Sequence, residues 1–120
     1  MRQPTPLKIQ LVWWRRSLEG EELPIYINDP QVGYYKTRAW SRGPYIPARI
    51  WLEQEIELET GELADDEIYR AEIGEKPWDA LEAWIWIAQK PVSLKEYQML
   101  KKALPLIKMD GTRAPTYSHV

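Results

Sequence analysis

Cations and aromatic rings share one stretch of the sequence that contains no acid, residues 33–51 (GYYKTRAWSRGPYIPARIW). Lys and Arg side chains bind phosphates, and flat Tyr and Trp rings can stack on unpaired bases. Residues of these types on one surface would suit nucleic-acid binding. The candidate binding residues are Tyr34, Lys36, Arg38, Trp40, Arg42, Arg49 and Trp51.

Acids dominate the part of the chain that follows. Residues 53–82 hold twelve acids and two cations, whereas residues 90–113 hold six cations and two acids. The net charge of −2 therefore conceals a basic, an acidic and a second basic block. The candidate acidic surface consists of Glu53, Glu55, Glu57, Asp65, Asp66 and Glu67.

Two interpretations of these acids stay open. Ordered carboxylates can imitate a nucleic-acid backbone and occupy a basic groove on another protein. Alternatively, the acids form a solvated sheet face, and Glu53, Glu55 and Glu57 pair across strands with the cations of residues 34–51. The second interpretation would leave fewer cations available to a ligand.

Residue types that most catalytic and metal sites require are scarce. The chain has no Cys, and its one histidine, His119, lies next to the last residue. None of the serines lies in a nucleophile-elbow pattern, and the glycines form no phosphate-binding loop. We therefore expect a non-enzymatic protein with neither cofactor nor metal. A hydrolase with paired carboxylates is a third alternative.

Length and composition indicate one folded domain. A chain of 120 residues with 44% hydrophobic residues can build a single core. Its seven Trp and seven Tyr, against no Phe, suit both cores and binding surfaces. No apolar run approaches the roughly 18 residues of a membrane span, and the N-terminus does not resemble a signal peptide. We expect a soluble, intracellular protein without membrane contact.

Alternation of apolar and polar residues predicts the first strands. Leu7–Trp14 alternates at its start. Leu23–Asn28 could be a short strand, which Pro24 would either confine to a sheet edge or begin. In a strand over Tyr34–Trp40, four of the candidate binding residues would share one face. They are Tyr34, Lys36, Arg38 and Trp40.

A long second strand should continue the sheet. After a turn at Arg42-Gly43-Pro44, residues 46–58 keep one apolar and one charged face, and their number suggests a bend or bulge. Thr60-Gly61 predicts a hairpin turn. We expect Ala64–Glu67 to be loop and Ile68–Ile73 to be a short returning strand.

The apolar period changes to that of a helix after residue 78. A capping box of Asp79 and Glu82 predicts a helix over Ala80–Lys90, and a similar box beginning at Ser93 predicts another over Leu94–Leu104. The first helix is apolar nearly all round, which predicts burial or contact with a partner.

Three further expectations concern this helical region. A homodimer through Trp84 and Trp86 is one form that contact with a partner could take. The second helix should face inward with Leu94, Tyr97, Leu100 and Leu104. Residues 107–120 have no period and are expected to form a loose tail.

Strands precede helices along the chain, and this order predicts an α+β fold. We expect an antiparallel, strongly bent sheet or small barrel over residues 7–73. A C-terminal helical hairpin, residues 79–104, would then pack against one face of the sheet. The whole chain would be a single domain.

Several short motifs occur together in residues 34–100. They are KTR, the turn RGP, the strand motif P-x-RIW, the turn ETGEL, and the segments DALEAW and PVSLKEYQML. In this combination the chain resembles a family of small proteins encoded by phages and prophages of proteobacteria. Its turn has one glycine fewer than the RGGP-like turn of that family. The resemblance transfers no activity, but it implies a phage accessory protein, a class that includes anti-CRISPR proteins and small replication or recombination partners.

Our leading hypothesis is a non-enzymatic phage-type protein that binds a partner protein, as an inhibitor of a host defence factor would. It would act in the cytoplasm of a bacterial host. The alternative is a small nucleic-acid-binding barrel that uses the basic aromatic hairpin. The two hypotheses differ in the chemistry of the ligand, which is a protein surface in one and a phosphate backbone in the other.

Overall fold

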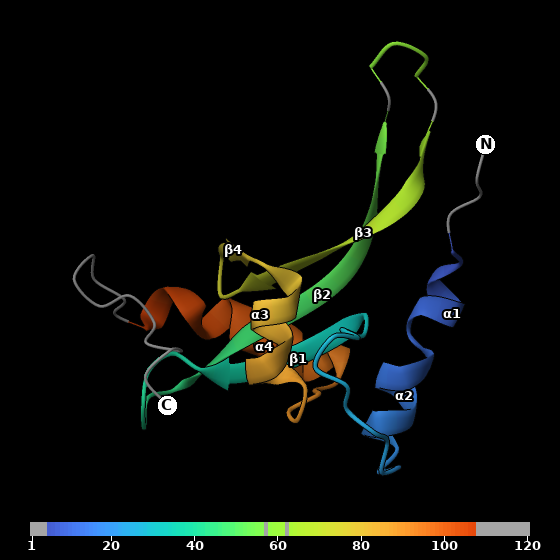
Figure 1. The fold of residues 1–120 in the computed structure, drawn as a ribbon. Helices are drawn as coiled ribbons and strands as arrows, with labels where there is room; N and C mark the ends of the chain where they lie inside the picture. Colours follow the sequence, from blue (N-terminus) through green and yellow to red (C-terminus); the bar gives the residue numbers. More distant parts are fainter. Residues whose placement is uncertain (1–4, 57, 62, 108–120) are drawn as a thin grey trace.

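The chain forms a four-stranded antiparallel sheet with short helices before and after it (Figure 1). The computed structural model describes residues 5–56, 58–61 and 63–107. The first elements are α1 (Leu7–Gln10), α2 (Val12–Leu18), β1 (Gly33–Arg38), β2 (Tyr45–Ile56), β3 (Leu63–Ile73) and β4 (Lys76–Trp78). They are followed by α3 (Ala80–Ile87), α4 (Leu94–Ala103) and the 3-10 turn η1 (Leu104–Leu106). The predicted α+β class is confirmed.

The sheet is open, and its strands follow one another in the order β1-β2-β3-β4. The alternative of a small barrel is therefore wrong. The bulge predicted for the long second strand is present, because the pairing of β2 with β3 shifts register between Gln54 and Ile56. β1 ends its pairing with β2 at Gly33 and Ile50, so β2 continues well beyond it.

The two faces of the sheet carry the residues that alternation assigned to them. On one, here called the Tyr35 face, Tyr35 lies opposite Ala48, which in turn lies opposite Ile73. All three are buried, together with Ile46 and Ile50 on the same face. The other, the Tyr34 face, carries the cations of β1 and β2. Burial of one face against a core explains why these segments fold as strands.

Helices α3 and α4 lie on opposite faces of the sheet, so the prediction of a helical hairpin on one face is wrong. Trp84 of α3 packs edge-on against Tyr35, with ring centroids 5.6 Å apart. Tyr97 of α4 packs against Tyr34 on the other side, at 4.8 Å. The sheet is thus the middle of three layers.

The connection between the two helices passes along the edge of β1. The Lys36 amide donates to the Lys90 carbonyl (3.1 Å), and the Val92 amide donates to the Tyr34 carbonyl (3.0 Å). Pro91 forms a bridge with Tyr35 between these bonds. The connection therefore covers part of the edge that β1 would otherwise expose, and it holds Lys90 beside β1.

The N-terminal segment is helical, so the predicted strand over Leu7–Trp14 is wrong. Leu11 and Trp14, three positions apart, are its buried residues. The Trp14 indole nitrogen donates to the carbonyls of Tyr34 (2.9 Å) and Val92 (3.0 Å). A helical spacing brings both buried side chains to the core, which an alternating strand would not do.

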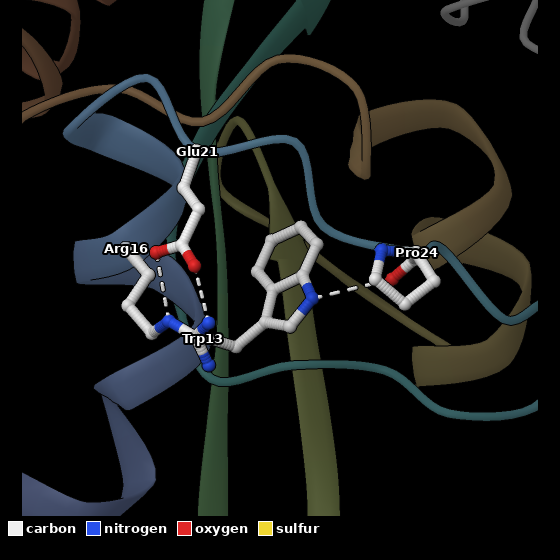
Figure 2. A network of polar contacts seen from close by, with 4 residues as sticks. All are labelled: Trp13, Arg16, Glu21 and Pro24. Atoms are coloured by element: carbon white, nitrogen blue, oxygen red, sulfur yellow. Dashed lines mark hydrogen bonds and ion pairs between the residues drawn. The ribbon is translucent and has the colours of Figure 1, made fainter.

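The predicted strand over Leu23–Asn28 is also wrong, because this segment has no regular structure. Tryptophan N–H groups hold its backbone. The Trp84 indole donates to the Tyr26 carbonyl (2.9 Å), and Trp13 donates to the Pro24 carbonyl (3.3 Å). Figure 2 shows the second contact beside an ion pair of Arg16 and Glu21, which lies across the turn after α2.

Smaller differences concern the ends of the predicted elements. Residues 64–67, expected as loop, belong to β3, and α3 ends at Ile87 and not at Lys90. Both helix caps are confirmed, with Asp79 accepting from the Glu82 amide and Ser93 from the Glu96 amide, each at 3.1 Å.

The inward face of α4 is confirmed in part. Tyr97 and Leu104 are buried and Leu100 is half-buried, whereas Leu94, predicted to face inward, is exposed. The expected tail lies outside the described residues from 108 onward. None of the helices in the described part of the chain combines the length and apolar character needed to cross a membrane.

Candidate functional site

The candidate binding residues do not form one continuous surface. Tyr34, Lys36 and Arg38 lie on β1, Arg49 and Trp51 lie on β2, and Trp40 and Arg42 lie in the turn between the strands. Helix α4 covers the middle of the Tyr34 face. It separates the turn end of the hairpin from the end that carries Trp51.

Tyr34 contributes to packing. Its ring lies 5.4 Å from that of Trp14 and 4.8 Å from that of Tyr97, between α2 and α4. A ring in contact with two other rings has little surface left on which a base could stack. The prediction that Tyr34 joins a binding surface therefore gains no support from its position.

Arg49 and Trp51 interact mainly with their own chain. The Arg49 guanidinium carbon lies 4.2 Å from the centroid of the Trp51 ring. Its Nε lies 3.5 Å from Oε1 of Glu72, although it makes no hydrogen bond with the described part of the chain. Lys101 of α4 reaches the same carboxylate oxygen at 3.2 Å. The Arg49 charge is thus partly neutralised, and one face of Trp51 is covered.

A cluster of cations surrounds Tyr45 at the turn end of the hairpin. The centroid of its ring lies 4.6 Å from Nζ of Lys36, 4.5 Å from Cζ of Arg38 and 5.4 Å from Nζ of Lys90. Lys90 Nζ also lies 3.4 Å from the phenol oxygen. We call Lys36, Arg38, Tyr45 and Lys90 the Tyr45 cluster.

The charges of the Tyr45 cluster are only partly balanced. Lys36 forms an ion pair with Glu96 of α4 at 2.9 Å. Within the described chain, Arg38 and Lys90 form no ion pair, and Arg38 Nη1 donates to the Gly43 carbonyl at 2.8 Å. Two exposed cations of the cluster therefore remain available to an anion.

The positive environment changes the acidity of the phenol. The hydrogen bond with Lys90 lowers the pKa of Tyr45, and the charges of Arg38, Lys90 and Lys36 lower it further. A lowered phenol pKa means that the surrounding cations stabilise a negative charge at this oxygen. The same field would stabilise the oxygen of an anionic ligand.

The turn beside this cluster has an unusual backbone. Arg42 is exposed and has a φ of 61°, in the left-handed region that non-glycine residues rarely adopt. Gly43 is required beside it, because a Cβ there would lie 2.7 Å from the Trp40 indole. The turn thus holds Trp40 over Gly43 and leaves Arg42 exposed three residues before Tyr45.

Two residues of the cluster were missing from the candidates drawn from the sequence. Tyr45 lies within the basic aromatic stretch, directly before the strand predicted over residues 46–58. Lys90 lies 45 residues further along the chain. Only the pairing of Lys90 and Val92 with the edge of β1 brings it into place.

The acidic candidates lie on the other end of β2 and on β3. Glu53 accepts from Arg70 Nε at 2.9 Å, and Glu67 accepts from the Thr5 amide (3.2 Å) and hydroxyl (2.6 Å). Glu55, Asp65 and Asp66 lie on strands by their backbone, and Glu57 lies outside the described residues. Lys36 pairs with Glu96 and Arg49 with Glu72, whereas Glu53 pairs with Arg70, so the predicted pairing of Glu53 with the cations of residues 34–51 is wrong.

These acids belong to a ribbon that projects from the body of the molecule (Figure 1). β1 pairs with β2 only up to Ile50, and β4 pairs with β3 only from Ala71 onward. The ribbon formed by the rest of β2 and β3, here called the acidic arm (residues 51–70), therefore has two strands. Near its tip, Leu58 and Glu59 are exposed.

Trp84, proposed as a contact between two copies, is a core residue. Its side chain is 1% exposed and packs against Tyr35 and Trp13. Its burial leaves it almost no surface for a contact with a second copy, and the predicted homodimer stays a prediction. The large apolar side chains that α3 exposes are Leu81 and Ile85, while Trp86 is half-buried.

A cavity of about 250 Å³ lies between α1 and the sheet. Its lining includes Leu7, Leu11, Arg49 and Trp51, and no carboxylate residue belongs to it among those described. The described residues also contain no group of three His, Cys, Asp or Glu side chains that could hold a metal ion. The cavity therefore lacks the converging carboxylates on which the hydrolase alternative would depend.

Comparison with known proteins adds no relative. No protein-family model matches the chain, and no curated protein or solved structure is significantly similar to it.

Proposed function

We propose that this chain is a non-enzymatic accessory protein of the phage type that binds another protein and inhibits a host defence factor, as anti-CRISPR proteins do. The acidic arm carries this proposal. It is a projecting ribbon, and residues 53–67 contain eight acids and no cation. In this role the protein would act in the cytoplasm of a bacterial host.

The charge density of the arm suits a partner that normally holds nucleic acid. On the described strands of the arm, residues 53–56 and 63–67, five acids lie along a paired ribbon that spans about 15 Å. This is about one negative charge per 3 Å, which is close to the spacing of phosphates along one strand of B-DNA. A basic groove that accepts a phosphate backbone could therefore accept this arm.

The open edges of the arm also favour a protein contact. An isolated two-stranded ribbon is marginally stable in water, and unpaired strand edges are ready to pair with another chain. Contacts with the rest of the chain, such as Thr5 with Glu67, hold its base. The tip at Leu58 and Glu59 remains exposed to a partner.

Capture from a host lysate tests this function. The wild-type protein should retain a stoichiometric protein partner that an excess of duplex DNA or RNA displaces. The arm variant neutralises three acids, Glu59→Gln, Asp65→Asn and Asp66→Asn. The control variant neutralises three exposed acids elsewhere, Glu19→Gln, Glu22→Gln and Glu75→Gln.

We expect the arm variant to lose at least about tenfold in affinity, since several charge pairs with the partner would vanish, and the control to bind like the wild type. The proposal fails if no protein is retained at low salt. It fails equally if both variants bind the partner as the wild type does.

A second function, nucleic-acid binding, has one observation in its favour, the exposed cations Arg38 and Lys90 without an ion pair in the described chain. Because cations of the chain lie over the Tyr45 and Trp51 rings, contact would depend on phosphates more than on base stacking. A gel-shift titration at low ionic strength tests this function with Arg38→Glu. Lys95→Glu, on the exposed side of α4, is the matched control. Equal binding by both variants would contradict it.

A further inference from the structure

The Tyr45 cluster brings charged groups from three separate parts of the chain to the phenol of the half-buried Tyr45. Lys36 and Arg38 come from β1, Tyr45 begins β2, and Lys90 comes from the connection between α3 and α4. We propose that this cluster binds the terminal phosphate of a nucleic-acid strand. The inference rests on the second function above for the source of the phosphate, and it adds Tyr45 and Lys90 to the site.

The charge of the cluster matches a phosphate monoester. Among the described residues, three cations and the one carboxylate paired with them, Glu96, leave a net charge of +2. A phosphate monoester carries about −1.5 to −2 near pH 7, whereas each phosphodiester within a strand carries one negative charge. A terminal phosphate therefore neutralises the cluster more completely than an internal one.

The donors of the cluster fit the oxygens of this group. Arg38 uses one N–H for the Gly43 carbonyl and keeps others for an anion. Lys90 Nζ lies only 3.4 Å from the Tyr45 hydroxyl, so one phosphate oxygen beside the pair could accept from both donors. The lowered pKa of the Tyr45 phenol agrees with a site that favours negative charge.

The rest of a strand would find a further cation beside the cluster. Arg42 is exposed in the adjoining turn, three residues before Tyr45. It can contact the phosphodiester that follows the terminal phosphate. A phosphorylated peptide has no second phosphate at that spacing, which favours a nucleic-acid strand as the ligand.

The experiment compares two oligonucleotides of about twelve nucleotides that differ only in a 5′ phosphate or a 5′ hydroxyl. Fluorescence anisotropy at low ionic strength measures their affinity for the full chain. The site variants are Arg38→Gln, Lys90→Gln and Tyr45→Phe. The controls Lys95→Gln and Lys102→Gln remove the same charge from exposed positions on α4.

We expect the phosphorylated strand to bind about tenfold more tightly, as charge-assisted hydrogen bonds would produce. Arg38→Gln and Lys90→Gln should abolish this preference, and the controls should keep it. Phosphate should also raise the pKa of the Tyr45 phenol in an ultraviolet titration, because it engages the cations that lower that pKa. Circular dichroism verifies that each variant is folded.

Two results would overturn the inference. Equal binding of the two oligonucleotides would remove the phosphate site while leaving nucleic-acid binding in place. Preference for a phosphorylated peptide, with no binding of either oligonucleotide, would remove the strand as the ligand together with the second function. Capture of a protein partner by the arm is independent of both results.

Discussion

Trp14 joins three parts of the chain through one buried indole. Its N–H donates to the carbonyls of Tyr34 and Val92, and its ring lies against Gly33, where an added Cβ would come within 2.4 Å of it. One donor shared by two carbonyls links α2 to β1 and to the connection before α4. This residue therefore fixes the position of the edge that also holds Lys90.

Replacing Trp14 should destabilise the fold more than replacing its neighbour. Trp14→Phe removes the N–H donor from the part-buried carbonyl of Tyr34 and the buried carbonyl of Val92, which we expect to cost about 1–3 kcal/mol in free energy of unfolding. Trp13→Phe is the matched control, since the Trp13 indole makes one longer and exposed bond of 3.3 Å. Urea denaturation measures both, and equal losses would contradict the role given to Trp14.

Tyr35 makes the free energy of unfolding depend on pH in the alkaline range. Burial raises the pKa of its phenol far above the ordinary value, and the hydroxyl donates to the Gln31 carbonyl at 2.9 Å. In the unfolded chain this phenol ionises near pH 10, whereas in the folded chain it keeps its proton. The unfolded state therefore binds fewer protons above pH 10, and the free energy of unfolding falls as pH rises.

We expect a decrease of about 1.4 kcal/mol per pH unit above pH 10 from this group. Burial also raises the pKa of Tyr69 and Tyr97, which adds to the slope. Tyr35→Phe should give a shallower slope in urea denaturation at several pH values. Identical slopes for the two proteins would show that Tyr35 ionises as easily when folded as when unfolded.

At the scale of elements, α4 begins at a cap and carries groups that meet the sheet. Ser93 accepts from the Glu96 amide, and the same helix places Glu96 beside Lys36 and Lys101 beside Glu72. Ser93→Ala should cost about 1 kcal/mol in free energy of unfolding, the usual loss of an N-cap. Ser41→Ala, at an exposed turn position, should change stability by less than about 0.5 kcal/mol. A cost at Ser41 equal to that at Ser93 would argue against the cap.

The sequence predicted the elements whose signal is local. The alternation of β1 and β2 and the two caps depend on residues close in sequence, and they appear in the structure. The strand predicted for the N-terminal segment is wrong because Leu7, Ile9 and Leu11 alternate over only five residues, which is too short a pattern to decide between strand and helix. Burial of Leu11 and Trp14 against distant parts of the chain decided in favour of helix.

The candidate site was predictable only in part for a similar reason. Lys36 and Arg38 stood out by type and spacing, and they lie together beside Tyr45. The contact of Arg49 with Glu72 depends on the register of β2 and β3. The contact of Lys90 with Tyr45 depends on the path of the chain between α3 and α4. A proline and a valine before the cap at Ser93 were the sole local indication that this path is extended.

At the scale of the whole molecule, opposite charges occupy opposite ends of β2. The Tyr45 cluster lies at its start and the acidic arm contains its end, and twelve residues of strand span about 40 Å. Exposed charges are screened over about 8 Å at physiological ionic strength. The acids of the arm therefore do not prevent an anion from binding at Tyr45, and the two ends can bind separate ligands.

Separate ends imply that the acidic arm can be removed without unfolding the body. No residue between 53 and 70 belongs to the buried core of the described chain. Gln54 and Glu67 lie opposite each other on β2 and β3, so Asn-Gly in place of residues 55–66 would close the hairpin with a two-residue turn. We expect the melting temperature of this variant to stay within about 5 °C of the wild type, because a loss of about 1 kcal/mol shifts it by that amount.

The same deletion should abolish capture of the protein partner and leave phosphate binding at Tyr45 unchanged. A full-length variant with every acid of residues 53–67 replaced by its amide separates charge from shape. Loss of the partner in both variants would assign binding to the carboxylates, whereas loss in the deletion alone would assign it to the strand edges. Capture of the partner by the deletion variant would contradict this prediction. The variant lacks the acids and strand edges of residues 55–66, so the protein contact would then lie outside the arm.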